Sequence, residues 1–171
     1  LVPILGRPLV LHAADATARA LGRDHTVVAT DGERIAAVVR DAGFRVVMTS
    51  GDALTGTDRL WEVATQLPAD VYINVQGDEP MLDPLDIVAI ADAKRRQPGF
   101  VINGVHPLDP SEDPSDRNIP KVVINESGVM LYISRSPIPG YKSDANRPRE
   151  YLKQVCIYAF NRSDLDAFAS L

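Results

Sequence analysis

VYINVQGDEP, residues 71–80, carries the strongest signal of the fold in this sequence. Its first five residues are mostly β-branched or aromatic, and so short an apolar run is typical of a strand buried on both faces. The strand pattern stops at a Gln-Gly pair, which is followed by Asp78 and Glu79. A helical pattern begins after Pro84. Because ligands of open α/β sheets bind at the carboxyl ends of the strands, the two carboxylates stand where a ligand is expected.

Asp78 and Glu79 allow two interpretations. A carboxylate at a strand end can hold Mg²⁺ against a substrate phosphate, because Mg²⁺ takes one or two protein carboxylates together with phosphate oxygens and water. The alternative is a solvated turn, a setting in which Asp is common. The local pattern alone leaves both interpretations open.

The rest of the first hundred residues alternates between helix and strand patterns. Apolar residues at helical spacing predict helices marked by residues 9–20, 35–42, 60–67 and 85–96. On the last of these, Leu85, Val88 and Ala91 are expected to share one apolar face. Runs rich in β-formers predict strands at 25–30, 45–48 and 71–75. This order indicates βαβ units and an α/β, Rossmann-like fold with a mostly parallel sheet.

The pattern changes after Gly99. We expect a strand at 100–106, a loop rich in Pro and Asp at 107–120, a hairpin with strands at 121–125 and 129–134, and a strand at 152–160. Residues 161–163 resemble the cap of a final helix. Long loops inside a compact domain are usually binding loops, so the 100–160 region is interpreted as a β-rich insertion over the ligand edge of a single domain, 1–171.

Composition narrows the function classes. The chain has 171 residues, a net charge of −5 and 45% hydrophobic residues, which suits one globular domain and argues against a general nucleic-acid binder. The single cysteine, Cys156, excludes a disulfide framework within the chain, and no signal peptide or membrane-spanning run is visible. We therefore expect a cytoplasmic protein without a nucleic-acid or membrane partner. The sequence starts without Met and ends inside a helical pattern, so both ends are expected to be trimmed.

Several nucleotide-site and catalytic motifs are missing. The dinucleotide fingerprint G-x-G-x-x-G and the nucleophile motif G-x-S-x-G do not occur. Gly51 and Gly56 have P-loop spacing, but Thr57 and Asp58 stand where Lys and Ser or Thr are required. The three histidines are isolated from one another and from the cysteine, which favours packing or surface roles over metal binding.

Polar turns at the predicted strand ends are the remaining candidates. Asp31 is expected to cap the helix that follows it. In residues 55–59, glycine permits close approach of a ligand to a helix N-terminus, where anions are favoured. Arg59 is unfavourable for the helix dipole there, which favours a functional role. Arg135 ends an apolar strand, and its guanidinium suits either a substrate carboxylate or a structural ion pair.

The sequence resembles the CMP-sugar synthetases, most of all the 3-deoxy-manno-octulosonate (KDO) cytidylyltransferases, which are of the nucleotide-diphospho-sugar transferase type. Residues 75–80 resemble the metal-binding signature of that family. Further matching segments occur in the same order along the chain, at residues 4–9, 28–31, 50 with 55–59, 121–123, 131–139 and 157–160.

The resemblance implies a reaction and a set of roles. CTP and an acidic 2-keto sugar would give the CMP-sugar and pyrophosphate with Mg²⁺, for lipopolysaccharide or surface-glycan synthesis, in a homodimer with an interface at hairpin 121–134. Asp78 would be the metal ligand and, with Arg135, catalytic; Lys121 would contact phosphate or sugar. The implied nucleotide contacts are Thr30, Asp31, Gly56, Thr57, Asp58, Arg59 and Gln76, and the implied sugar contacts are Arg135, Gln154 and Tyr158.

Three departures from the family pattern bear on function. The family begins with a strand and a basic, glycine-rich loop that grips the triphosphate, and a later aspartate completes its metal site; neither segment is found here. Gln154 stands where KDO enzymes usually carry His, which leaves room for an 8-amino or related sugar. The alternatives are a CMP-acylneuraminate-type synthetase, a Mg²⁺-dependent glycosyltransferase of the same broad fold, and a non-catalytic, dimer-forming relative.

Overall fold

The computed structural model describes all of residues 1–171, which divide into two compact units. Unit 1 comprises residues 1–102 and 156–171, and unit 2 comprises residues 103–155. The elements are β1 (Pro3–Ile4), β2 (Arg7–Pro8), α1 (Leu9–Leu21), η1 (Arg23–His25), β3 (Val27–Thr30), α2 (Glu33–Asp41), β4 (Arg45–Met48), α3 (Gly56–Gln66), β5 (Tyr72–Val75), α4 (Pro84–Arg96), β6 (Ile102–Pro107), β7 (Lys121–Ile124), β8 (Met130–Ser134), η2 (Asp144–Asn146), β9 (Leu152–Phe160) and α5 (Arg162–Ala169). The predicted α/β class is confirmed.

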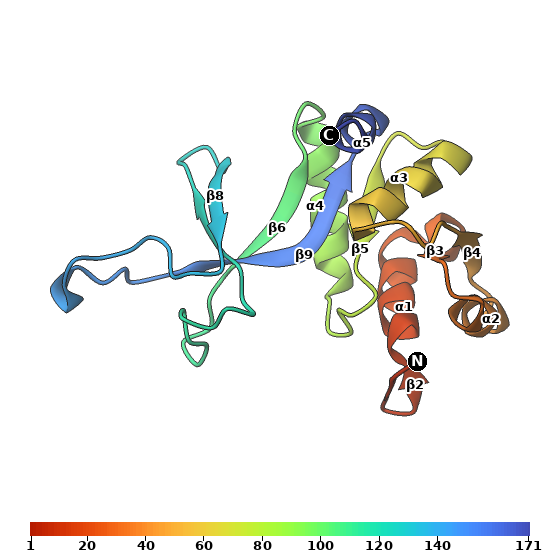
Figure 1. Ribbon diagram of the computed structural model, residues 1–171, viewed down its shortest axis with the longest axis horizontal. Helices are drawn as coiled ribbons and strands as arrows, with labels where there is room; N and C mark the ends of the chain where they lie inside the picture. Colours follow the sequence, from red (N-terminus) through yellow and green to blue (C-terminus); the bar gives the residue numbers. More distant parts are fainter. The chain divides into compact units, whose positions relative to one another are not determined.

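The first βαβ segment is β3–α2–β4 (Figure 1). β3 and β4 are parallel, with Val27 opposite Arg45 and Thr30 opposite Met48. The strand is shorter at its start than the predicted 25–30, because residues 23–25 form a 3₁₀ turn and the Thr26 hydroxyl donates to the Gly22 carbonyl. The chain therefore enters the sheet only at Val27.

Within the stretch 71–80, residues 72–75 form β5, whose sheet partner is β9. The two strands are antiparallel, with Tyr72 opposite Phe160 and Val75 opposite Ile157. β5 is the last strand in its sheet order and β3 pairs only with β4, so each of them keeps one edge without a neighbouring strand. Within the confirmed fold class, the pairing is mixed, with the parallel pair β3–β4 beside antiparallel pairs.

Two apolar clusters hold unit 1 together. One joins α1 to α2 and the start of β4 through Leu11, Ala14, Val39 and Phe44. The other joins α3, β5, β9 and α5 through Ala64, Tyr72, Phe160 and Leu165. The phenolic hydroxyl of Tyr72 also donates to the Leu67 carbonyl and accepts the Ala69 amide, so the α3–β5 connection is tied to the strand it enters.

The prediction for α4 holds only in part, because Ala91 is buried and Val88 is half-buried but Leu85 is not. Leu85 is 73% exposed, whereas Ile87, Ile90, Ala91 and Lys94 are buried. Positions 87, 90, 91 and 94 have the i, i+3, i+4, i+7 spacing of one helix face, and α4 packs on α1. Leu85, in the first turn next to the Asp83 cap, lies off that stripe.

Unit 2 contains the predicted hairpin. β7 and β8 are antiparallel, with Lys121 opposite Ser134 and a register shift between Val123 and Ile124. The turn contains Gly128 at φ +78°, a conformation that favours glycine. β7 also pairs with the first part of β9, so β8 is an outer strand.

Lys94 is the most buried charged group of unit 1. Its ammonium donates to the carbonyls of Pro98 and Phe100, at 3.0 and 2.6 Å, and to Asp164 Oδ2 at 2.5 Å. The same carboxylate accepts the Asn161 amide in the capping box of α5. One cation therefore fixes the end of α4 and the start of α5.

Lys94→Met is expected to lower the free energy of unfolding by about 3 kcal/mol, because it leaves the largely buried Asp164 carboxylate without its cation. Chemical denaturation followed by circular dichroism measures the change. The matched control is Lys142→Met, at an exposed lysine, and should stay within about 0.5 kcal/mol of the unmodified protein. Equal losses in the two variants would contradict this role of Lys94.

Candidate active site

The candidate site lies in unit 1, where β3, β4 and β5 end near the start of α3. Thr30 is buried, and its hydroxyl accepts the Gly32 amide at 3.1 Å. The prediction that Asp31 caps α2 was wrong, because Gly32 occupies the N-cap position without a side-chain bond. Asp31 Oδ1 instead lies 3.5 Å from Arg59 Nη2. Asp31 turns toward a residue of α3 rather than toward its own helix.

Arg59 links three elements of the site. Its Nη1 donates to the hydroxyl of Thr49, directly after β4, while Nη2 pairs with Asp31, directly after β3. The side chain is only 22% exposed. Arg59 is unfavourable for the helix dipole of α3, and these contacts offset that cost.

The first turn of α3 is closed by its own residues. Thr55 and Asp58 form a capping box, in which each side chain accepts the other's backbone amide. The Asp58 carboxylate also accepts the Thr55 hydroxyl at 2.6 Å. A Cβ on Gly56 would lie 3.4 Å from Asn74 Nδ2, so glycine lets the helix start close to β5. The Asp58 carboxylate is therefore engaged within the helix cap.

Asp78 and Gln76 follow β5 directly. The exposed Asp78 carboxylate takes part in no hydrogen bond or ion pair within the chain, and the half-buried Gln76 side chain has no partner either. Both residues line the same cavity as Gly56 and Arg59. Residues 71–80 therefore offer the Asp78 carboxylate and the Gln76 amide, neither of which is bonded within the chain, beside the fixed Arg59.

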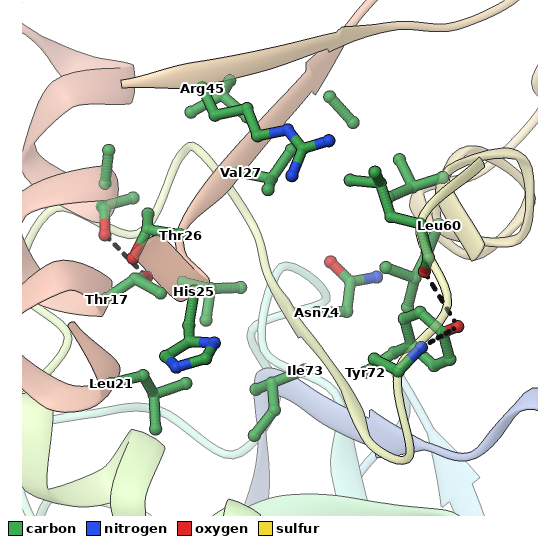
Figure 2. Close-up of a pocket in the computed structure, with 18 of the residues that line it drawn as sticks. Thr17, Leu21, His25, Thr26, Val27, Arg45, Leu60, Tyr72, Ile73 and Asn74 are labelled. Atoms are coloured by element: carbon green, nitrogen blue, oxygen red, sulfur yellow. Dashed lines mark hydrogen bonds between the residues drawn. The ribbon is translucent and has the colours of Figure 1, made fainter. Parts of the chain in front are cut away.

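This cavity has a volume of about 820 Å³. Figure 2 shows part of its wall, with Val27 and Arg45 from the β3–β4 pair and Tyr72, Ile73 and Asn74 from β5. Asn74 Nδ2 is buried in this wall without a hydrogen-bond acceptor. Sequence reasoning missed Asn74, although an amide in an otherwise apolar strand was a usable signal.

Comparison with known proteins assigns the family. A family model described as "Cytidylyltransferase" matches residues 1–169.

The chain belongs to the cytidylyltransferase family.

The relatives include a 3-deoxy-manno-octulosonate cytidylyltransferase of Chlorobaculum tepidum, which is 41% identical over all of this chain and 70% of that protein. The enzyme of the same name from Escherichia coli is 37% identical, over all of this chain and 69% of that protein. The family resemblance inferred from the sequence motifs is confirmed.

Comparison with solved structures supports the same family. A structure described as CMP:2-keto-3-deoxy-manno-octonic acid synthetase complexed with CTP matches with a TM-score of 0.90 and 38% identity, over all of this chain and 70% of that one. An inositol-1-phosphate CTP transferase of T. maritima, at 16% identity and a TM-score of 0.62, shares the fold. No helix of this cytidylyltransferase combines the length and apolar character needed to cross a bilayer.

Arg135 and Gln154 of the cytidylyltransferase lie in unit 2. Arg135 Nη1 donates to the carbonyls of Arg117 and Asn118, at 2.7 and 3.3 Å. Its other guanidinium nitrogens have no partner within the chain, so part of the fork is available to a ligand. Gln154 Nε2 donates to Asn103 Oδ1 at 3.2 Å, which leaves its own carbonyl oxygen without a partner.

Lys121 has a structural role instead of the expected ligand contact. It is fully buried, and its ammonium donates to the carbonyls of Asp116, Ile119 and Arg135. Burial lowers the pKa of Lys121. All three of its hydrogens are used within the chain, so none is left for phosphate or sugar. Lys121 instead ties the backbone of Arg135 to the preceding loop.

Tyr158 lies in the unit 1 part of β9, opposite Asn74 in the strand register. Its ring stacks on Phe160 with centroids 6.2 Å apart, and its hydroxyl has no partner within the chain. Burial raises the pKa of Tyr158, so the hydroxyl stays protonated and can donate a hydrogen bond at neutral pH.

The acidic, His and Cys side chains of the protein determine which kind of metal ion it could hold. No three His, Cys, Asp or Glu side chains converge on one point, so the chain offers no closed protein cage for an ion. Asp78 does suit the coordination preference of Mg²⁺, because this ion keeps several waters and binds through one or two carboxylates plus substrate phosphates. Zinc, by contrast, takes three or four protein ligands.

Proposed function

We propose that this protein transfers the cytidylyl group of CTP to an acidic 2-keto sugar, forming a CMP-sugar and releasing pyrophosphate. The observation that supports this most is the match of the entire chain to relatives named 3-deoxy-manno-octulosonate cytidylyltransferase. In the reaction the anomeric hydroxyl of the sugar attacks the α-phosphorus of CTP, and the bond from that phosphorus to the β-phosphate oxygen breaks. The proposed setting is cytoplasmic synthesis of lipopolysaccharide or surface glycan.

The nucleotide is proposed to bind at the ends of β3 and β5. Gln76 has a free amide, and Gly56 starts a helix whose N-terminus favours phosphate. Arg59, already held by Asp31 and Thr49, places a fixed positive charge beside them. A fixed cation stabilises negative charge on phosphate oxygens without having to reorganise during the reaction.

Asp78 is proposed to hold Mg²⁺. When bound, Mg²⁺ neutralises charge on the phosphate oxygens of the reacting nucleotide. The contribution of the chain is a carboxylate at a fixed strand end, with no internal cation to compete for it.

Arg135, Gln154 and Tyr158 are proposed to contact the sugar. The free part of the Arg135 fork suits the carboxylate of an acidic sugar, and the hydroxyl of the half-buried Tyr158 can donate to a sugar oxygen. Gln154 is anchored through its NH₂ group, so its carbonyl oxygen is available as an acceptor. An acceptor suits a hydroxyl or an amine, which keeps KDO and an 8-amino derivative as candidate substrates.

A homodimer through the hairpin 121–134 is also proposed. On β8, Leu131 and Tyr132 are each 63% exposed and Ile133 is 40% exposed. Three consecutive exposed apolar residues on an outer strand are typical of an interaction surface.

In the protein expressed from its complete reading frame, Asp78→Asn is expected to lower kcat/KM for pyrophosphate release in Mg²⁺ by about 100-fold or more, because the amide keeps the shape but not the charge. Glu79→Gln is the matched control, as it removes the neighbouring carboxylate, and it should keep the rate within a few-fold. Near-normal turnover by Asp78→Asn, or equal losses in both variants, would contradict the role proposed for Asp78.

Leu131→Glu is expected to convert the dimer to a monomer in sedimentation velocity, since it places a charge in the proposed apolar interface. Leu85→Glu, at the 73% exposed first turn of α4, should leave the dimer intact. A monomeric unmodified protein, or an unchanged Leu131→Glu dimer, would refute the proposed interface.

A further inference from the structure

Two side-chain amides of unit 2 are hydrogen-bonded to each other. Asn103 is on β6 and Gln154 is on β9, and these two strands pair in one sheet. Gln154 Nε2 donates to Asn103 Oδ1 at 3.2 Å, and Asn103 Nδ2 donates to the Val155 carbonyl at 2.9 Å. The two bonds form a chain that begins at a main-chain carbonyl and ends at the Gln154 side chain.

The Val155 carbonyl sets the direction of both bonds. A main-chain carbonyl oxygen only accepts, so the Asn103 side chain turns its NH₂ group toward it. The Asn103 oxygen then faces Gln154, which presents its own NH₂ group in return. Rotating the Gln154 amide by half a turn would set two acceptor oxygens against each other. Gln154 is therefore held with its oxygen as the group left for a ligand.

The backbone of Gln154 is held near that of Arg135. The Gln154 amide donates to the Pro120 carbonyl at 2.9 Å, directly before β7. Lys121, the next residue, lies opposite Ser134 of β8, which directly precedes Arg135. Two of the proposed sugar contacts, Gln154 and Arg135, thus belong to the same set of paired strands in unit 2.

We propose that Asn103 is a positioning residue that determines sugar specificity, because it holds Gln154 as a hydrogen-bond acceptor and so selects sugars with a donor at that point. The inference rests on the sugar contact proposed for Gln154 under the proposed function. Asn103 acts through Gln154, and the proposal requires no contact between Asn103 and the substrate.

The chemical class selected is a sugar hydroxyl or ammonium group, since both donate. An ether oxygen, a carbonyl oxygen or a fluorine cannot donate, so each would face the Gln154 oxygen without a bond. A glutamine without an anchor rotates its amide to suit either class and discriminates less. A site with a fixed hydrogen-bonding group rejects a substrate that leaves this group unpaired. The discrimination therefore belongs to the pair of Asn103 and Gln154.

Steady-state kinetics with CTP, on the protein from its complete reading frame, test this role. The sugars are KDO and two analogues, in which fluorine replaces one or the other of the two outermost hydroxyls. Fluorine is close to a hydroxyl in size but cannot donate. The unmodified protein should prefer KDO to one of the analogues by about tenfold or more in kcat/KM. Asn103→Leu should lower that preference by about fivefold or more, because Gln154 can then turn its NH₂ group toward the fluorine.

Two further variants separate this role from a structural one. Asn103→Asp also loses the bond to the Val155 carbonyl but keeps an oxygen facing Gln154, so the preference for KDO should stay. In the Asn103→Leu background, Gln154→Glu should restore the preference, because an ionised carboxylate only accepts. KDO and its fluorinated analogues carry the same charge, so the charge added by Asp or Glu cancels in the ratio. Asn103→Ala removes the same oxygen and takes the place of the Leu variant if circular dichroism shows that variant unfolded.

Four results would overturn the inference. An unchanged preference in Asn103→Leu, equal losses in the Leu and Asp variants, or no restoration by Gln154→Glu each removes the role of Asn103 and leaves the proposed function standing. Turnover of KDO by the unmodified protein without any preference over either analogue means that Gln154 does not contact these hydroxyls. A protein that forms no CMP-sugar from CTP and KDO would instead count against the proposed function, and the inference would fall with it.

Discussion

The ion pair and hydrogen bond of Arg59 are the contacts on which the candidate site depends. The guanidinium joins Thr49, after β4, to Asp31, after β3, and it does so from the first turn of α3. The same turn packs against β5, where Gly56 approaches Asn74. Arg59 therefore aligns two strand ends, and its helix turn borders the third, before any ligand is present, which lowers the reorganisation needed on binding.

Some polar groups make structural hydrogen bonds within the chain, and others remain available to bind a ligand. Asp58 is engaged in the cap of α3, and Lys121 gives all its hydrogens to backbone carbonyls. Asp78 and Gln76 have no such commitments. A charged residue in a matching motif is thus a ligand candidate only when its own fold has not already used its hydrogen-bonding capacity.

Most helices and strands could be predicted because the sequence pattern of each lies within its own residues. The apolar run before Asp78 gave a strand, helical spacing gave α1 to α4, and Asn161 marked the capping box of α5. The predicted Asp31 cap was wrong, and Leu85 does not share the buried face of α4 with Ala91. Both outcomes depend on distant partners: Arg59 for the first, and the packing of α4 on α1 for the second. The three-carbonyl cage around Lys121 likewise joins residues that no short window contains. The roles of Arg135, Gln154 and Tyr158 toward sugar stay predictions.

The proposed function requires that CTP binds where β3 and β5 end beside α3. The most direct measurement is amide chemical-shift mapping of the 171-residue chain by NMR, titrated with CTP in Mg²⁺ and, separately, with GTP. We expect CTP-specific shifts concentrated at 55–59 and 76–78, with the β7–β8 turn unaffected. Shifts that are equal for GTP, or that leave 55–59 and 76–78 unchanged, would contradict it.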